Sequence, residues 1–151
     1  TGASSARARA AVDDLATINW TANSAFQAVL GTVSIKFNGQ AVSAGSTAFV
    51  VDLLKSDGSA LGSATQQTCT PLAGNSCSVT FGPQFTISAG DTQATKVRVN
   101  SASFFNGANT GDALSVLING VADVQVNDGT TPGIVLETST VPYTISNTSY
   151  E

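Results

Sequence analysis

Apolar and polar residues alternate with a period of two through much of this chain. The clearest example is residues 76–99, where three alternating rows are separated by Gly82-Pro83 and by the sequence SAGD. A period of two places successive side chains on opposite faces of a strand, so that one face is buried and the other meets water. We therefore expect consecutive strands of an antiparallel sheet here.

The same alternation predicts about nine or ten short strands in all, at the spacing of about 8–12 residues that is typical of sandwiches and barrels. The expected segments after the first strand are 33–37, 47–56, 77–81, 85–89, 95–99, 114–118, 122–126, 134–137 and 141–145. Residues 59–70 predict a weaker strand, and residues 103–105 close a strand. Residues 12–21 alternate poorly, which predicts a first strand that is buried on both faces or bulged. Asn119-Gly120 predicts a two-residue hairpin.

One flat sheet of ten strands could not bury an apolar face on each side, whereas two stacked sheets can. The predicted fold is therefore all-β, a two-sheet antiparallel β-sandwich of immunoglobulin-like or jelly-roll-like type. At 151 residues the chain has the length of one ordinary domain. We assign residues 12–151 to that domain and residues 1–11 to an extended N-terminal arm or tail.

The arm alternates small residues with arginine. In an extended conformation Ala6, Ala8, Ala10 and Val12 lie on one side. Arg7, Arg9, Ala11 and Asp13 lie on the other side. A short helix would lack an apolar stripe, and a disordered tail is an alternative. A strand that adds to a sheet edge, in its own chain or in a neighbour, is the third interpretation. The residues predicted to contact a neighbour are Ala6, Ala8, Ala10, Val12 and Leu15.

The composition is typical of a secreted or cell-surface β protein. Hydrophobic residues make up 42% of the chain, but charged residues make up only 11%, against an average of about 25%. The formal net charge is −4, and the basic residues form no stripe. Nucleic acid and anionic membranes are therefore not expected partners. No apolar run reaches the roughly 18–20 residues of a membrane span.

The two cysteines, Cys69 and Cys77, flank a segment with turn residues at Pro71 and Gly74-Asn75. We expect them to face each other across a hairpin at disulfide distance. A metal site would need further ligands, and the chain has no His and no other Cys. The predicted disulfide favours an oxidising compartment, and hence an extracellular or cell-surface location.

No catalytic motif is present, so we do not expect an enzyme. The absence of His removes the common triads and acid–base pairs, and no nucleophile elbow or phosphate-binding glycine loop occurs. Carboxylate pairs such as Asp13-Asp14 remain. Aspartates beside glycines are mainly turn residues. Asp112 and Asp128 are the candidates for a calcium ligand, and no other cofactor is expected.

Two sequons, at Asn19 and Asn147, are candidate glycosylation sites. Trp20 has two interpretations, as a platform on which a sugar stacks or as a core residue. A carbohydrate-binding module that uses Trp20, Tyr143 or Tyr150 is therefore one alternative function.

The sequence also resembles β-sandwich modules of prokaryotic cell-surface, S-layer-like and filament-forming proteins. The resemblance is carried by an F-x-I-x-A-G-D strand and turn, Phe85 to Asp91, and by a G-D-x-L-x-V strand, Gly111 to Val116. It extends over about residues 12–130 as a rhythm of short motifs. Such modules build or decorate surfaces and carry no chemistry. The Cys69–Cys77 hairpin is not a general feature of these modules.

Within that group, archaeal threads, bundling pili and TasA-like fibres link their subunits by donor-strand exchange, in which an N-terminal segment fills a groove of the next subunit. The resemblance thus implies a non-enzymatic extracellular subunit that assembles with copies of itself into a filament or coat, with residues 1–20 as the contact. The head domain of a type IV-like pilin is an alternative, and it predicts the end of a helix in residues 6–30.

Overall fold

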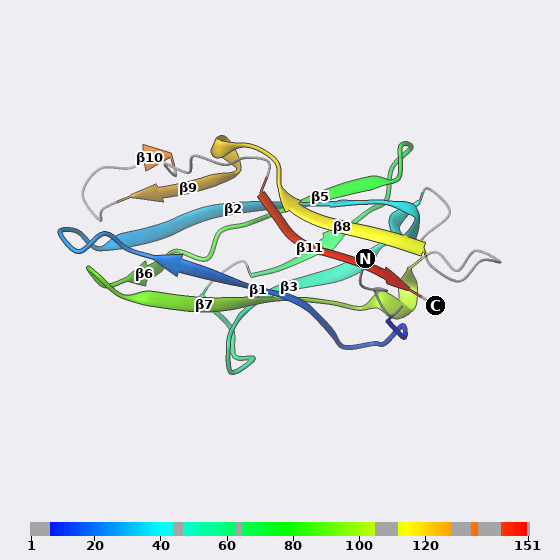
Figure 1. Cartoon of the computed structure of the whole chain (residues 1–151), viewed down its shortest axis with the longest axis horizontal. Helices are drawn as coiled ribbons and strands as arrows, with labels where there is room; N and C mark the ends of the chain where they lie inside the picture. Colours follow the sequence, from blue (N-terminus) through cyan, green and yellow to red (C-terminus); the bar gives the residue numbers. More distant parts are fainter. Residues whose placement is uncertain are drawn as a thin grey trace, which may run out of the picture.

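The computed structural model describes residues 7–43, 47–62, 65–104, 112–127, 134–135 and 143–150. In this part of the chain, two antiparallel sheets pack face to face along the long axis of the molecule (Figure 1). The predicted all-β sandwich is confirmed. The segment in which a pilin head would carry the end of its helix contains strand β1 (Asp13–Thr21) instead.

The smaller sheet has four strands in the order β1-β7-β3-β4. β7 (Thr92–Val99) lies at the centre and pairs with β1 on one side and with β3 (Phe49–Lys55) on the other. Among the described residues, β4 (Gln66–Cys69) pairs with β3 alone, so β1 and β4 are the two edges of this sheet.

The larger sheet is organised around β2 (Ala28–Asn38), the longest strand. Every other strand of this sheet lies antiparallel to β2 or to a strand that pairs with it. One side of β2 carries β5 and β6, the other side carries β8 and β9, and β10 and β11 form the outer edge beyond these. Their bounds are β5 (Ser76–Phe81), β6 (Phe85–Ile87), β8 (Asp112–Ile118), β9 (Val124–Asn127), β10 (Ile134–Val135) and β11 (Tyr143–Tyr150).

The hairpin predicted at Asn119-Gly120 is wrong. β8 and β9 do not pair with each other, because both lie antiparallel to β2 along the same side of it. The short 3₁₀ helix η3 (Val121–Asp123) joins them. The side-chain carboxylate of Asp123 accepts hydrogen bonds from the backbone N–H groups of Asn119 and Gly120, at 3.1 and 2.8 Å. These bonds stabilise a bend in one long strand, so the chain does not reverse.

The bulge predicted in the first strand is confirmed. The register of β1 against β7 shifts between Asp14 and Ala16. An extra residue at this point changes which positions face inward. Asp13 and Leu15 are buried before the shift, and Ile18 and Trp20 are buried after it. The irregular alternation of this segment therefore records a bulge in an ordinary half-buried strand.

The core holds a chain of edge-to-face aromatic pairs that crosses between the sheets. Phe37 of β2 meets Phe49 of β3, with ring centroids 5.5 Å apart. Phe49 then meets Phe104 at 4.8 Å, and Phe104 meets Tyr150 of β11 at 5.1 Å. Phe104 follows η2 (Ser101–Ser103), and a third 3₁₀ helix, η1 (Gln40–Val42), follows β2. Such pairs add to the stabilisation from apolar burial, and they carry the packing as far as the last strand.

Candidate functional site

The two lateral sides of the sandwich are built differently. On one side, the disulfide Cys69–Cys77 joins β4 of the smaller sheet to β5 of the larger sheet, with Cα atoms 5.8 Å apart. The predicted disulfide is confirmed, but its predicted place within a hairpin of one sheet is wrong. Both cysteines are buried, and their bridge closes this side by linking the two layers.

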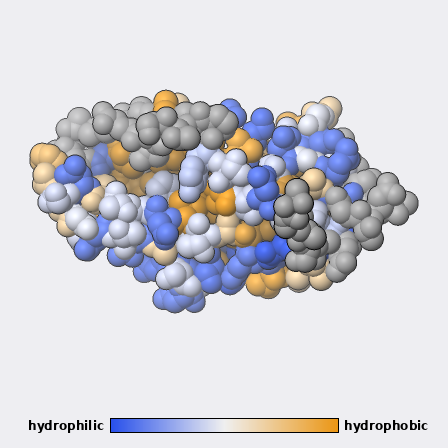
Figure 2. Space-filling model, viewed as in Figure 1, coloured by the Kyte–Doolittle hydropathy of each residue, from blue (hydrophilic) through white to orange (hydrophobic). Residues whose placement is uncertain are grey.

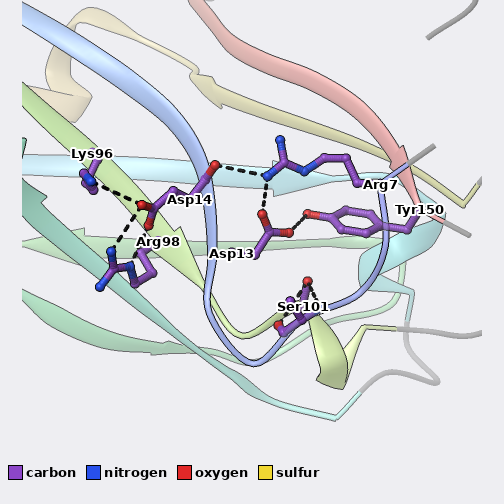
Figure 3. A network of polar contacts seen from close by, with 8 residues as sticks. Arg7, Asp13, Asp14, Lys96, Arg98, Ser101 and Tyr150 are labelled. Atoms are coloured by element: carbon purple, nitrogen blue, oxygen red, sulfur yellow. Dashed lines mark hydrogen bonds and ion pairs between the residues drawn. The ribbon is translucent and has the colours of Figure 1, made fainter. Parts of the chain in front are cut away.

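The opposite side has no covalent bridge in the described residues. Its edges are β1 and β11, and a buried hydrogen bond connects them. The hydroxyl of the fully buried Tyr150 donates to a carboxylate oxygen of Asp13 at 2.7 Å (Figure 3). Burial raises the pKa of Tyr150 above its ordinary value, and the hydrogen bond to Asp13 and that group's negative charge raise it further. The phenol therefore stays neutral and remains a donor.

The arm lies against its own domain beside this connection. The backbone N–H of Arg7 donates to the carbonyl of Ser149 at 2.7 Å, and Arg7 pairs in parallel with Tyr150. The Arg7 guanidinium donates to the carboxylate of Asp13 (Figure 3). Further along, the N–H of Ala10 donates to the hydroxyl of Ser101 at 2.9 Å. Residues 7–10 are thus held by backbone and side-chain bonds.

A second ion pair holds the arm to β8. The guanidinium of Arg9 lies 2.8 Å from the carboxylate of Asp112, and only 12% and 9% of these two side chains are exposed. A buried ion pair is expensive to break one partner at a time, because the remaining charge stays out of water. Arg9 and Asp112 are 103 residues apart in sequence. No local signal in the sequence could have paired them.

The arginine face of the arm meets the arm's own domain. The arginines, and not the alanine row, are directed at the domain, because the carboxylates of Asp13 and Asp112 bind them. Ala8 and Val12 are exposed, and Ala10 is half-buried. Leu15 lies in the core of its own domain, and Ala6 lies outside the described residues. Their contact with a neighbouring copy stays a prediction.

The neighbouring carboxylates Asp13 and Asp14 do not converge on one point. Asp13 is buried, whereas Asp14 is on the outer face, where it accepts hydrogen bonds from Arg98 at 2.6 Å and Lys96 at 3.2 Å (Figure 3). The hydrogen bond from Arg98 lowers the pKa of Asp14, and Lys96 acts in the same direction. Asp13 therefore binds a cation of the arm, and Asp14 binds two cations of the smaller sheet.

We call the side of the sandwich that is formed by β1 and β11 the open side. Along it, between β1 and strands β2 and β9, there is an apolar cleft with a volume of about 380 Å³. Figure 2 shows patches of hydrophobic surface on one face of the molecule. No charged side chain is among the described residues that line it. Its apolar walls are Ile18, Trp20, Leu30, Ile87, Ile118 and Val126, and its polar rim is Asn19, Thr21, Asn23 and Tyr143.

The aromatic residues predicted to bind sugar divide into three cases. Tyr150 is fully buried, so its prediction as a sugar contact is wrong. Trp20 is 7% exposed, and its indole N–H donates to the hydroxyl of Thr95 at 2.8 Å, which makes it a core residue that also walls the cleft. Tyr143 is 49% exposed at the rim. Of these three residues, Tyr143 is the one that is exposed to solvent.

Both sequon asparagines are exposed, Asn19 on β1 and Asn147 on β11. The side-chain oxygen of Asn147 accepts a hydrogen bond from Ser115 at 2.6 Å. Glycosylation at either position stays a prediction. Asn19 is also a rim residue of the cleft, so a sugar there would lie beside its opening.

The two candidate calcium ligands are not brought together in the described structure. Asp112 is engaged by Arg9, and Asp128 lies outside the described residues. Among the residues that the structure does describe, no group of three or more His, Cys, Asp or Glu side chains could hold a metal ion. Asp112 instead holds the arm through its ion pair with Arg9.

Comparison with known proteins identifies no relative, since no family model, curated protein or solved structure matches this chain. In the described part of the chain, no helix is long and apolar enough to cross a membrane.

Proposed function

We propose that this chain is a non-enzymatic structural subunit that assembles with copies of itself into an extracellular filament or coat. The observation that carries the proposal is the open side, where two edge strands, β1 and β11, flank a cleft whose described lining is largely apolar and has no charged side chain. Strand edges are the usual means by which β proteins associate. The opposite side carries the disulfide.

We also propose that the arm can be exchanged between copies. Residues 7–10 hold the domain through backbone bonds to β11 and η2 and through the Arg7–Asp13 and Arg9–Asp112 ion pairs. The same segment from a second copy would make the same contacts, so exchange changes the free energy little. Ala11 and Val12, both exposed, join the arm to β1 and are the natural hinge. Exchange that does not close into a ring propagates into a fibre.

The extracellular location is supported by the buried disulfide, since such bonds persist in oxidising compartments. The low proportion of charged residues, 11%, points the same way.

Assembly can be tested with the purified full chain by sedimentation and negative-stain electron microscopy. We expect fibres or sheets, and a synthetic peptide of residues 1–12, added in excess, should block growth by filling the site of the arm. A peptide of residues 1–12 that carries Arg9→Met should block growth less well, because it brings no cation to Asp112. The matched control is the same peptide with Ala8→Ser, since Ala8 is exposed.

A wild-type protein that stays monomeric at all concentrations would refute the assembly proposal. Growth that continues unchanged with excess peptide would refute the exchange of the arm, while leaving assembly itself in place.

Carbohydrate binding is a second candidate, supported by one observation. Tyr143 is 49% exposed and lines the cleft together with Asn19 and Asn23. Aromatic faces beside amide groups suit sugar rings. A glycan array tests this, and Tyr143→Ala should abolish any binding that uses the rim.

A further inference from the structure

The docked arm is held at two points by carboxylates that belong to different sheets. Arg7 binds Asp13 of β1 in the smaller sheet. Arg9 binds Asp112 of β8 in the larger sheet. Ala8, the residue between the two arginines, is exposed. Because successive side chains of an extended segment point to opposite sides, the arm presents both cations to the domain and its alanine to solvent.

Tyr150 fixes the position of one carboxylate relative to the other. Its backbone lies opposite Asp112 in the pairing of β11 with β8, and its hydroxyl donates to Asp13 at 2.7 Å. Arg7 pairs in parallel with the same residue. Since Tyr150 is fully buried, the two carboxylates and the strand edge beside them form one preorganised arrangement. A segment that binds here therefore meets acceptors whose spacing is already set.

The bulge of β1 gives Arg7 a second acceptor. The Arg7 guanidinium donates to the carboxylate of Asp13 and also to the backbone carbonyl of Asp14, the second bond being 3.1 Å long (Figure 3). The register of β1 against β7 shifts between Asp14 and Ala16. Bulges of this kind disrupt the ladder locally and re-aim groups beside functional sites. The bulge thus lies where the arm is bound, and the arginine finds two acceptors on consecutive residues.

We propose that this end of the open side is a peptide-binding site specific for an extended segment with arginines at alternate positions, and that its ligand is the arm of a second copy. The inference rests on the proposed exchange of the arm, since it names what that exchange recognises. Two arginines three positions apart would lie on opposite faces of the segment, so that only one could reach a carboxylate. The other carboxylate side chain, 4% exposed in Asp13 and 9% exposed in Asp112, would lose the arginine in a buried setting.

The same two contacts select the register in which the segment binds. A slip of one residue turns both arginines toward solvent. A slip of two residues leaves one arginine with a carboxylate and brings Ser5 or Ala11 to the other carboxylate. The register of the docked arm is therefore the one that gives each carboxylate an arginine. Exchanged arms would all bind in this position, which gives neighbouring copies a constant spacing.

Binding of short peptides to the full chain tests this specificity. In the variant Arg7→Ser/Arg9→Ser the arm brings no cation, whereas the carboxylates of the site are unchanged. The first peptide is residues 1–12, labelled with a fluorophore and followed by anisotropy. The matched peptide carries Arg9→Ala and Ala10→Arg, which keeps the composition and charge but places the arginines three positions apart. We expect the first peptide to bind at least about tenfold more tightly, because removal of one partner from a buried charge pair weakens binding strongly.

A second measurement covers the case in which Arg7→Ser/Arg9→Ser does not fold. The two peptides are then added unlabelled to the wild-type chain, and hydrogen exchange is followed at the amide of Ala10, which donates to Ser101 in the docked arm. The first peptide should accelerate this exchange by displacing the arm. The matched peptide should need at least about tenfold higher concentration for the same acceleration.

The outcomes separate this inference from the proposed function. Equal affinity of the two peptides would refute the inference, since charge alone would then explain binding, while exchange of the arm would stand. If neither peptide binds, the inference and the exchange are both wrong, and assembly through other contacts stands. If the first peptide binds specifically but the wild type stays monomeric in sedimentation, the specificity is supported and the proposed filament is refuted.

Discussion

Replacement of Tyr150 by Phe tests the connection that holds the open side together. The hydroxyl is fully buried and donates to Asp13 at 2.7 Å. A hydrogen bond to a charged acceptor contributes about 1.5–3 kcal/mol, and the substitution leaves the ring, and so the contact with Phe104, in place. We expect the free energy of unfolding to fall by that amount. For a domain of this size, the loss corresponds to a decrease in Tm of about 3–12 °C.

The assay is reversible thermal or urea unfolding at pH 7, followed by circular dichroism with the disulfide intact. Tyr143→Phe is the matched control, because the same atom is removed from a ring that is 49% exposed, and its effect should be within about 0.5 kcal/mol of zero. If Tyr150→Phe changes stability no more than this control, Tyr150 is not bonded to Asp13 and the account of the open side is wrong.

The same hydroxyl also predicts how stability depends on pH. The pKa of Tyr150 is raised in the folded state, so its contribution is complete below the unfolded pKa of about 10 and is lost as the pH rises above that value. In Tyr150→Phe, the loss of stability that comes from ionisation of this phenol at alkaline pH should be absent. Wild type and variant should therefore converge in stability between about pH 10 and pH 12. A constant difference across this range would contradict the assignment.

Three further predictions follow from particular contacts. Replacing Cys69 and Cys77 together by Ala should lower the free energy of unfolding by about 2–3 kcal/mol, because the cross-link no longer restricts the unfolded chain. Urea unfolding measures this loss, and a loss below about 1 kcal/mol would contradict the prediction. The lowered pKa of Asp14 means that its contribution is present above its unfolded pKa of 3.8 and is lost as the pH falls through the folded value; Asp14→Asn should therefore flatten the stability profile on the acid side, and an unchanged profile would count against it. Gly39→Ala should destabilise the fold by about 1–3 kcal/mol, because φ is 132° and a Cβ would lie 2.2 Å from the carbonyl oxygen of Ala113; wild-type Tm in this variant would show that the turn is wrongly placed.

Local pattern was sufficient for the fold class. Alternation with a period of two depends only on neighbouring residues, and it correctly predicted most of the strands and the stacking of two sheets. The irregular alternation of residues 12–21 predicted the bulge near Ala16 for the same reason. The disulfide was predictable because the chain offers only Cys69 and Cys77.

Tertiary structure decided which segments meet, and each wrong prediction came from a partner far away in sequence. Asn119-Gly120 has the composition of a hairpin, but β2 pairs with both flanking strands and makes it a bend. Cys69 and Cys77 lie in different sheets because their strands pair with β3 and β2. These pairings depend on the packing of the whole chain.

The arm and the cleft show most clearly which features the sequence determined and which the tertiary structure decided. The sequence determined that residues 6–12 alternate small and basic side chains, and hence that an extended arm has two distinct faces. Which face meets the domain was decided by Asp13 and Asp112, whose buried carboxylates draw in the arginines. The cleft lies between β1 of the smaller sheet and strands of the larger sheet, including β2 and β9. A local period determines what each strand exposes, but the enclosed space between two sheets depends on their mutual packing.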